Sequence, residues 1–193
     1  AMFKTAYTAM DHLPGWFGEP EARMLYECCA VARRGAVLID LGAHAGRSTV
    51  LMAFAAKTLG GEVHAIDAWD EAIWPREAKM TPVQAMESLR ETLTKRGLRG
   101  LVDVVQSRFE IAAAGWRRDI DVLHVDGAHD MLSVQGDLQA WAPHVIPGGV
   151  VVLHDYNYGC GVKRAATDFF SPECWRFLGE AASIVGAYRR IGL

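Results

Sequence analysis

Short apolar runs alternate along the chain with longer segments in which apolar residues recur every three or four positions. Five runs have the length and the Val, Ile and Leu content of buried strands, at residues 36–41, 62–67, 102–106, 120–126 and 150–154. The segments between them carry a helical period, at residues 49–59, 83–96, 109–114 and 132–141. Nearly continuous apolar strands separated by helices predict a parallel sheet covered on both faces.

The end of the chain has a different pattern. A predicted helix at residues 163–170 precedes two strand-like runs, 175–178 and 184–191, joined by a few residues around 179–182. This connection is too short for a crossover helix, so we expect an antiparallel hairpin. The predicted fold class is therefore α/β, with a doubly wound, seven-stranded, mostly parallel sheet and a C-terminal antiparallel hairpin.

Polar residues collect where the predicted parallel strands end. These residues are Asp40, Asp67, Gln106, Ser107, Asp126, His154 and Asp155. The carboxyl ends of parallel strands lie at one edge of the sheet, where doubly wound folds bind their ligands. We therefore expect a ligand site at this edge.

The stretch "DLGAHAGRS" joins the first strand to the next helix. Gly42 permits a tight turn, and Gly46 is expected to let the backbone pass close to a ligand at the helix N-terminus. The G-x-G-x-x-G fingerprint of dinucleotide sites is missing, because Ala43 and His44 occupy its middle. Asp67 ends the second strand, where a carboxylate accepts hydrogen bonds from ribose hydroxyls.

Charge and cysteine content narrow the classes of partner. The net charge is −3, and no apolar run has the length of a membrane span, so we expect neither nucleic acid nor a membrane as partner. The four cysteines have neither zinc spacing nor a C-x-x-C pair, which predicts reduced thiols and a cytoplasmic protein. The length of 193 residues suits one domain.

Two stretches resemble a known family. "LIDLGAHAGRSTV" and "VHAIDAWD" resemble the first two motifs of class I S-adenosylmethionine-dependent methyltransferases. "DVLHVDGAHDMLSVQGDLQAWAPHVIPGGVVVLHDY" is similar to a subgroup of small-molecule O-methyltransferases that modify antibiotic sugars and macrolides, the macrocin type. The resemblance implies a Rossmann-like methyltransferase fold, with residues 1–193 as one domain, a cap helix at about 19–34 and the catalytic sheet at about 36–191.

The resemblance also implies a set of residues that bind S-adenosylmethionine. Asp40, Gly42 and Gly46 would border its methionine part, Ser48 its carboxylate, Asp67 the ribose, Ala68 and Trp69 the adenosine, Ser107 and Arg108 the adenine, and Asp126 the methyl group. Two alternatives stay open at this point. Trp69 would otherwise pack beneath a lid, and Ser107 would otherwise cap a helix.

Methylation of a hydroxyl requires that its proton be removed by a base or that its oxygen be bound by a metal. Asp126, His154 and Asp155 would hold a divalent cation, either Mg²⁺ or Mn²⁺. The sugar-modifying relatives commonly have an acid where His154 stands, and a histidine favours Mn²⁺, Fe²⁺ or Zn²⁺ over Mg²⁺. His154 would otherwise be a base or a neutral hydrogen-bonding partner.

Histidines near the predicted edge are candidates for the base. His129 follows Asp126 by three residues, and an unperturbed histidine titrates near neutrality, so His129 is a candidate catalytic residue together with Asp126. The alternative is a helix-entry histidine bonded to backbone. We expect His44 at a solvent edge of the loop, and no converging partners for His12, His64, His124 and His144. Asp130 and Asp137 are interpreted as helix caps and surface charges.

The acceptor is expected to be a small hydroxylated molecule, because no separate substrate domain is present; otherwise a partner subunit of a homo-oligomer completes the pocket. Trp16 and Phe17 either cover the site or pack on the sheet. One alternative function is an NAD(P)-dependent oxidoreductase, disfavoured by the missing third glycine and by the lack of a Tyr-x-x-x-Lys pair. Another is a non-catalytic S-adenosylmethionine-binding module, which has little need for four acid and histidine groups at one edge.

Overall fold

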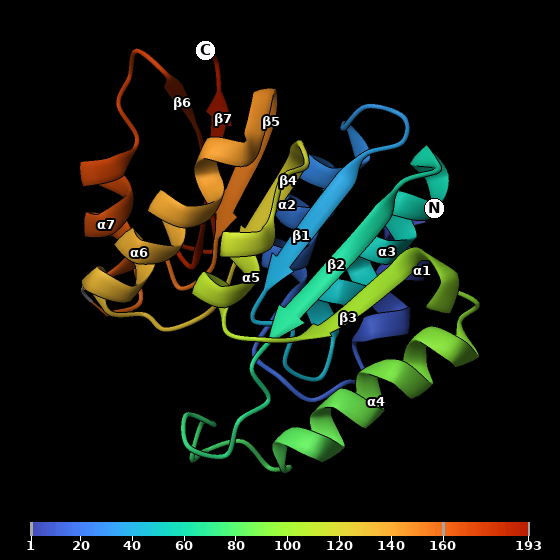
Figure 1. Ribbon diagram of the computed structural model, residues 1–193. Helices are drawn as coiled ribbons and strands as arrows, with labels where there is room; N and C mark the ends of the chain where they lie inside the picture. Colours follow the sequence, from blue (N-terminus) through green and yellow to red (C-terminus); the bar gives the residue numbers. More distant parts are fainter. Residues whose placement is uncertain (1, 160, 193) are drawn as a thin grey trace.

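A seven-stranded sheet lies at the centre of the computed structural model, which describes residues 2–159 and 161–192. Its strand order is β3-β2-β1-β4-β5-β7-β6 (Figure 1). The strands are β1 (Val37–Leu41), β2 (Glu62–Asp67), β3 (Val102–Gln106), β4 (Ile120–Val125), β5 (Val145–Leu153), β6 (Trp175–Ala181) and β7 (Val185–Arg190). Pairing is parallel from β3 to β5 and antiparallel for β7 against β5 and β6. The predicted fold class is confirmed.

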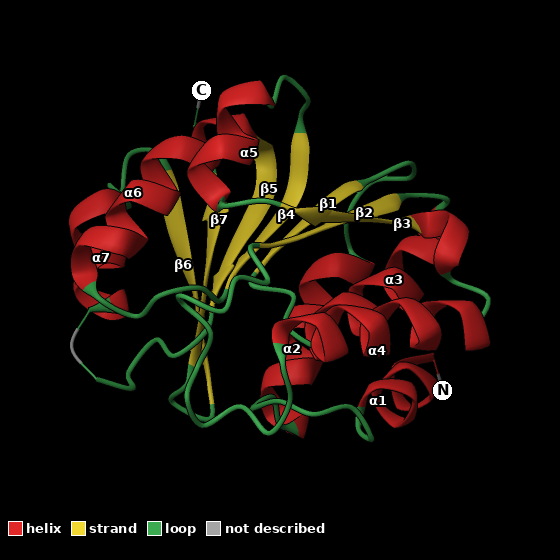
Figure 2. Cartoon of the chain, turned by 60° about the horizontal axis from the view of Figure 1, so that its bottom comes forward, coloured by secondary structure: helices red, strands yellow, loops and turns green. Residues whose placement is uncertain are grey.

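Helices cover both faces of this sheet (Figure 2). They are α1 (Met2–Met10), α2 (Glu19–Ala30), α3 (Arg47–Leu59), α4 (Pro82–Lys95), α5 (Phe109–Gly115), α6 (Met131–Trp141) and α7 (Val162–Phe169), with 3-10 turns η1 (Arg99–Leu101) and η2 (Ala142–His144). Helices α1 to α4 lie on one side and α5 to α7 on the other. Each side has its own apolar layer, so the buried strands contact helices on both faces, as the sequence predicts.

Some boundaries differ from the predicted ones. Strand β5 begins at Val145 rather than at residue 150, because residues 146–149 bulge out of the pairing with β4 instead of forming a separate turn. Strand β6 continues to Ala181, and the hairpin turns at Ala182 and Ser183, whose φ angles are 52° and 59°. Helix α1 is absent from the sequence-based prediction; it packs against α2 and α3 through its buried face.

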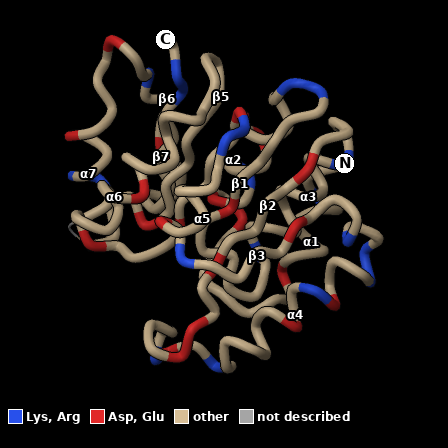
Figure 3. Tube along the Cα trace, viewed as in Figure 1, with Lys and Arg blue, Asp and Glu red and all other residues tan. Residues whose placement is uncertain are grey.

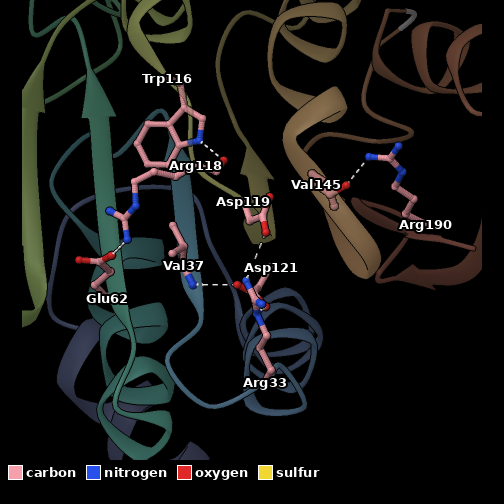
Figure 4. A network of polar contacts seen from close by, with 9 residues as sticks. All are labelled: Arg33, Val37, Glu62, Trp116, Arg118, Asp119, Asp121, Val145 and Arg190. Carbon is pink, nitrogen blue, oxygen red and sulfur yellow. Dashed lines mark hydrogen bonds and ion pairs between the residues drawn. The ribbon is translucent and has the colours of Figure 1, made fainter. Parts of the chain in front are cut away.

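Polar contacts tie together the strands at their amino ends (Figure 4). Arg33 donates to Asp121 over 2.7 Å, and the second oxygen of Asp121 accepts the backbone N–H of Val37 over 3.0 Å. Arg118 pairs with Glu62 beside β2. These contacts account for several charged residues far from the carboxyl ends of the strands, so they belong to the scaffold.

The described cysteines are reduced, and the described helices are short. Cys28 and Cys29 lie on α2, and these two and Cys174 are free thiols; Cys160 lies outside the described residues. Within residues 2–159 and 161–192, every helix falls short of the length and apolar character that crossing a bilayer requires.

Candidate functional site

The carboxyl ends of β1, β2, β4 and β5 form one edge of the sheet, and backbone hydrogen bonds continue past the strand ends. The N–H of Gly42 donates to Ile66 over 2.9 Å, that of Asp126 to Leu41 over 2.8 Å, and that of His154 to Val125 over 3.0 Å. The polar residues that follow the strands are therefore fixed by the same ladder as the strands themselves. Figure 1 shows this edge at the arrowheads of β1 and β2.

The loop after β1 depends on two glycines in the left-handed region, Gly42 with φ of 93° and Gly46 with φ of 97°. A Cβ atom at Gly42 would lie 1.9 Å from the carbonyl oxygen of Asp126. At Gly46 it would lie 2.4 Å from a methyl carbon of Leu89 on α4. The space next to both glycines is thus filled by this chain. The interpretation of Gly46 as the point of close approach to a ligand misses this packing reason.

Asp67 joins the β1 loop to the end of β2. Its two carboxylate oxygens accept the backbone N–H groups of His44 over 2.9 Å and of Trp69 over 3.0 Å. Burial raises the pKa of Asp67, although both N–H groups act in the opposite direction. Each oxygen keeps a further acceptor position, so the carboxylate has the free lone pairs that ribose hydroxyls require.

Trp69 is buried beneath the loop after β1. Its indole N–H donates to the carbonyl of His44 over 3.0 Å, and its φ is 42°. This arrangement matches the packing alternative, and contact with adenosine stays a prediction. The ring of His44 stacks on Trp74 with ring centres 4.8 Å apart, and His44 is half-buried, between the core and the solvent edge at which we expected it. The carbonyl of Ala68 accepts from Gln106 over 3.3 Å.

Asp40 has no exposed surface. Its carboxylate accepts the hydroxyls of Ser48 over 2.9 Å and Thr49 over 2.5 Å, and lies 2.8 Å from Nδ1 of His124. Asp40 and Ser48 therefore help to fix the end of β1 and the start of α3, and their role at the methionine part of the cofactor stays a prediction. His124 does have a converging partner, so that expectation is wrong. The same expectation is wrong for His64, whose Nδ1 lies 3.4 Å from a carboxylate oxygen of Asp103 and whose Nε2 lies 3.2 Å from the guanidinium of Arg118.

Ser107 and Arg108 follow β3. The backbone N–H of Ser107 donates to the carbonyl of Asp67 over 2.9 Å, which places Ser107 next to the end of β2. The N-cap of α5 is Arg108 rather than Ser107, so the helix-cap alternative for Ser107 is wrong. Arg108 is exposed and lies 3.7 Å from Asp70. The role of both residues at adenine stays a prediction.

Asp126, His154 and Asp155 converge at the ends of β4 and β5. Each offers one ligand atom, and these atoms lie within 4.8 Å of one another. Nδ1 of His154 lies 3.3 Å from a carboxylate oxygen of both Asp126 and Asp155, yet neither nitrogen of this ring, 4% exposed, makes an aligned hydrogen bond. Buried polar atoms require partners, and two carboxylates with an imidazole suit Mn²⁺, Fe²⁺ or Zn²⁺. The residues fit a divalent cation.

His129 reaches the same cluster from the loop before α6. Its Nε2 lies 2.9 Å from Asp155 and 3.8 Å from Asp126, and its side chain is 48% exposed. His129 thus contacts carboxylates, so the alternative of a histidine bonded only to backbone is wrong. The carboxylates of Asp126 and Asp155 raise the pKa of His129 to about 10. In the metal-free protein His129 carries a proton at neutral pH, contrary to the near-neutral titration that we expected.

The pKa values of the other three groups of the cluster are shifted in the directions that keep the imidazole protonated and the two carboxylates ionised. Burial lowers the pKa of His154, but the charge of Asp126 and contacts with both carboxylates outweigh burial and raise it to about 10. Burial acts against ionisation of Asp155, yet contacts with His129 and His154 lower its pKa to about 2. The pKa of Asp126 also lies below its ordinary value, chiefly because of His154. The carboxylates therefore require nearby positive charge, from protons on the histidines or from a cation.

The site includes residues whose roles the sequence analysis left open or did not assign. Phe17 stacks on His154 with ring centres 5.2 Å apart and also packs on the sheet, in the apolar layer that includes α1 to α4, so it has contacts that fit both of its alternatives. Arg47, the first residue of α3, holds the segment that carries Phe17. Arg47 could have been singled out in the sequence by its position at a helix N-terminus, where the helix dipole makes a cation unfavourable.

The two acidic residues of α6 have different environments. Asp130 is the N-cap of α6 and accepts the N–H of Ser133 over 3.0 Å, which confirms the predicted cap. Asp137, in the middle of the helix, is half-buried. Burial, with the nearby charges of Glu110 and Asp130, raises the pKa of Asp137 to about 7. The interpretation of Asp137 as an ordinary surface charge is therefore wrong.

Comparison with protein families identifies the class of protein that this fold and site define. The model of a methyltransferase domain family matches residues 39–156, more than half of the chain. The chain belongs to this methyltransferase family.

Solved methyltransferase structures share the fold at low sequence identity. The Podospora anserina methyltransferase PaMTH1, solved with S-adenosylhomocysteine bound, superposes with a TM-score of 0.71 at 10% identity, covering 99% of this chain and 88% of that one. The O-methyltransferase NovP superposes with a TM-score of 0.66 at 16% identity, covering 91% and 81%. An rRNA methylase from Streptococcus thermophilus superposes with a TM-score of 0.66 at 14% identity, covering 92% of this chain and 100% of that one.

A relative by sequence is an uncharacterized protein of Sinorhizobium fredii, y4gI. It is 29% identical over an alignment of 163 residues that covers 76% of this chain. The chain spans only 15% of the length of that relative.

Proposed function

We propose that this protein transfers the methyl group of S-adenosylmethionine to a hydroxyl of a small molecule, with a divalent cation held by Asp126, His154 and Asp155. The observation that carries the proposal is the convergence of these three side chains beside the β1 loop and Asp67. This edge offers a hydrogen-bond acceptor for ribose hydroxyls, Asp67 at the end of β2. It also offers a cluster of carboxylate and imidazole groups at the ends of β4 and β5. The first of these suits binding of the cofactor, and the second can supply the base or the metal that methylation of a hydroxyl requires.

The reaction is an in-line displacement at carbon. The acceptor oxygen forms a bond to the methyl carbon while the bond from that carbon to the sulfonium sulfur breaks, which leaves S-adenosylhomocysteine, and the hydroxyl proton goes to a base. When bound, the cation would anchor the acceptor oxygens and stabilise negative charge on the reacting one. Asp126 and His129 are the candidates for this base, and the lowered pKa of Asp126 makes its carboxylate a weak one. His129 acts as a base only once it has lost its own proton, because its pKa is raised to about 10.

Charge distribution favours a small acceptor over RNA. The net charge is −3, and lysine and arginine are interspersed with acidic residues along the trace in Figure 3. Proteins that bind nucleic acid by its phosphates gather basic residues on one face. The likeness to an rRNA methylase, at 14% identity, is a likeness of fold.

The family match favours methyl transfer over the dinucleotide-dependent alternative. Residues 39–156 include the loop after β1, Asp67 and the metal cluster, so the match covers the elements of the proposed site. The cluster also favours an enzyme over a non-catalytic module, because binding a nucleoside cofactor gives no use for two imidazoles beside two carboxylates at the far strands.

The test combines binding with turnover. The purified protein is titrated with S-adenosylmethionine and with NAD⁺ by calorimetry, and then incubated with S-adenosylmethionine, Mn²⁺ and a panel of sugars, catechols and hydroxylated macrolactones. The proposal predicts binding of S-adenosylmethionine alone and release of S-adenosylhomocysteine with at least one acceptor. Binding of NAD⁺ instead would contradict it, as would methylation of an RNA panel with no methylation of the small molecules.

A further inference from the structure

The segment of residues 11–17, here called the N-terminal strap, crosses the carboxyl edge of the sheet and is held there by one arginine. Arg47 donates to the backbone carbonyls of Leu13 over 2.6 Å, Asp11 over 2.9 Å and Phe17 over 2.8 Å, and pairs with the carboxylate of Asp11 over 3.0 Å. A guanidinium presents five N–H donors in a rigid fork, which fits several acceptors at once. The strap is therefore bound to the start of α3.

The hydrogen bonds of Arg47 stabilise the strap, whereas its position is unfavourable for α3. Arg47 is the first residue of α3, where the helix dipole disfavours a cation. Its hydrogen bonds to the strap offset that cost, and its side chain is largely removed from water, with 13% exposure. Gly15, with φ of 134°, lets the strap turn over this side chain: a Cβ there would lie 3.1 Å from Cδ of Arg47.

The residue that the strap delivers to the sheet edge is Phe17. Phe17 is buried, and its ring lies over the ring of His154 with centres 5.2 Å apart and planes 29° apart. It also meets the edge of the His124 ring at 5.7 Å. The neighbouring Trp16 is exposed and lies near His44 instead. Phe17 thus covers one face of the imidazole whose Nδ1 is aimed between Asp126 and Asp155.

We propose that Phe17 is a positioning residue for His154, and that Arg47 fixes the strap that carries it. A flat ring on one face of an imidazole restricts its rotation and keeps water from its nitrogens. Residues that orient a metal ligand raise the affinity of the site for the metal. The inference rests on the proposed metal site and adds to it a contribution from outside the residues that the family model matches, since Phe17 precedes residue 39.

The experiment measures Mn²⁺ affinity by calorimetry on full-length protein, with Phe17→Ala, Phe17→Leu and Arg47→Ala as test variants. Phe17→Ala is expected to weaken Mn²⁺ binding about tenfold, the lower end of the usual effect of a residue supporting a metal ligand. Phe17→Leu keeps an apolar cover without a flat face and is expected to give an intermediate loss, which preserves the test if the alanine variant does not fold. Arg47→Ala is expected to weaken binding in the same direction.

Two matched controls separate this effect from general loosening of the region. Trp16→Ala removes the exposed aromatic neighbour in the strap, and Arg23→Ala removes an exposed pair with Glu19 on α2. Both are expected to keep the wild-type Mn²⁺ affinity. A second readout is the visible absorption of the Co²⁺-loaded protein, which is expected to change shape in Phe17→Ala and to stay unchanged in both controls, because it depends on ligand geometry.

Two distinct failures are possible outcomes. Wild-type Mn²⁺ affinity and an unchanged Co²⁺ spectrum in both Phe17 variants would overturn the positioning role while leaving the metal site intact. Absence of Mn²⁺ and Co²⁺ binding by the wild-type protein would overturn the metal site itself, and the role of Phe17 with it.

Discussion

Nδ1 of His124 on β4 lies 2.8 Å from Oδ1 of Asp40 on β1, and both side chains are completely buried. The other oxygen of Asp40 accepts the hydroxyls of Ser48 and Thr49 at the start of α3. This one carboxylate thus ties the first strand of the site to its neighbour strand and to the helix that follows the β1 loop. The position of the loop depends on a buried polar network that no solvent reaches.

Asp40→Ala is expected to lower the free energy of unfolding by about 3 kcal/mol, because it leaves three buried donors without an acceptor. Urea unfolding followed by circular dichroism measures this change. Asp103→Ala is the matched control, since Asp103 also lies beside a histidine but is exposed. Equal stability of Asp40→Ala and Asp103→Ala would show that the network does not support the fold.

Asp67→Ala is expected to weaken binding of S-adenosylmethionine by about 2 kcal/mol, the usual value for loss of a charged hydrogen-bonding partner. The same change frees the N–H groups of His44 and Trp69, so the loop loses an anchor as well. Calorimetry measures the affinity, and circular dichroism checks that the fold is retained. Unchanged affinity in a folded variant would remove Asp67 from the ribose subsite.

Asp126→Asn keeps the size of the side chain but removes its charge. We expect this variant to bind S-adenosylmethionine with near wild-type affinity and to lose most of its methyl transfer, because the carboxylate serves the acceptor side of the reaction. Release of S-adenosylhomocysteine, measured by mass spectrometry at saturating cofactor, gives the rate. A rate equal to that of the wild-type protein would exclude Asp126 as both base and metal ligand.

The raised pKa of Asp137 predicts that the free energy of unfolding depends on pH. Its pKa is raised from 3.8 to about 7, so between these values the folded protein holds a proton that the unfolded chain has lost. Stability therefore falls as pH rises from about 4 to about 7, and the loss persists above pH 7. Asp137→Asn is expected to remove this loss and to stabilise the protein at pH 8 by about 2 to 3 kcal/mol, roughly half of what ~1.4 kcal/mol per pKa unit gives, because Asp137 is half-buried and water screens its charge.

Urea unfolding of both proteins at pH 4, 6 and 8 checks this expectation. The difference between Asp137→Asn and wild type is expected to be small at pH 4 and to grow toward pH 8. Asp130→Asn serves as the comparison, because Asp130 is an exposed cap whose pKa is lowered by its hydrogen bonds to Ser133. A constant difference across pH would place Asp137 in solvent.

The fold could be predicted because the apolar strands and the helical periods repeat cleanly along the chain. The bounds of β2 and β3 agree with the prediction, and the strand order brings Asp126 and Asp155 to neighbouring strand ends. That adjacency follows from topology alone, since parallel strands end at one edge. The candidate metal cluster could therefore be predicted without knowledge of any side-chain conformation.

The remaining features depend on tertiary contacts that no local pattern carries. His124 on β4 contacts Asp40 on the neighbouring strand β1, and Phe17 contacts His154, which lies more than a hundred residues later in the chain. The raised pKa of Asp137 comes from burial against α5, and the space that Gly46 leaves is taken by Leu89. Each of these depends on which helix lies on which face, and single-residue spacing does not encode that.

The most direct test of the account is methyl transfer by protein from which metal has been removed. The protein is treated with EDTA, checked by elemental analysis, and assayed for S-adenosylhomocysteine and methylated acceptor before and after addition of Mg²⁺ or Mn²⁺. We predict that turnover falls on removal of the metal and returns on its addition, and that Asp155→Asn abolishes the recovery. Full turnover by metal-free protein would contradict the metal site and leave Asp126 or His129 as the base alone.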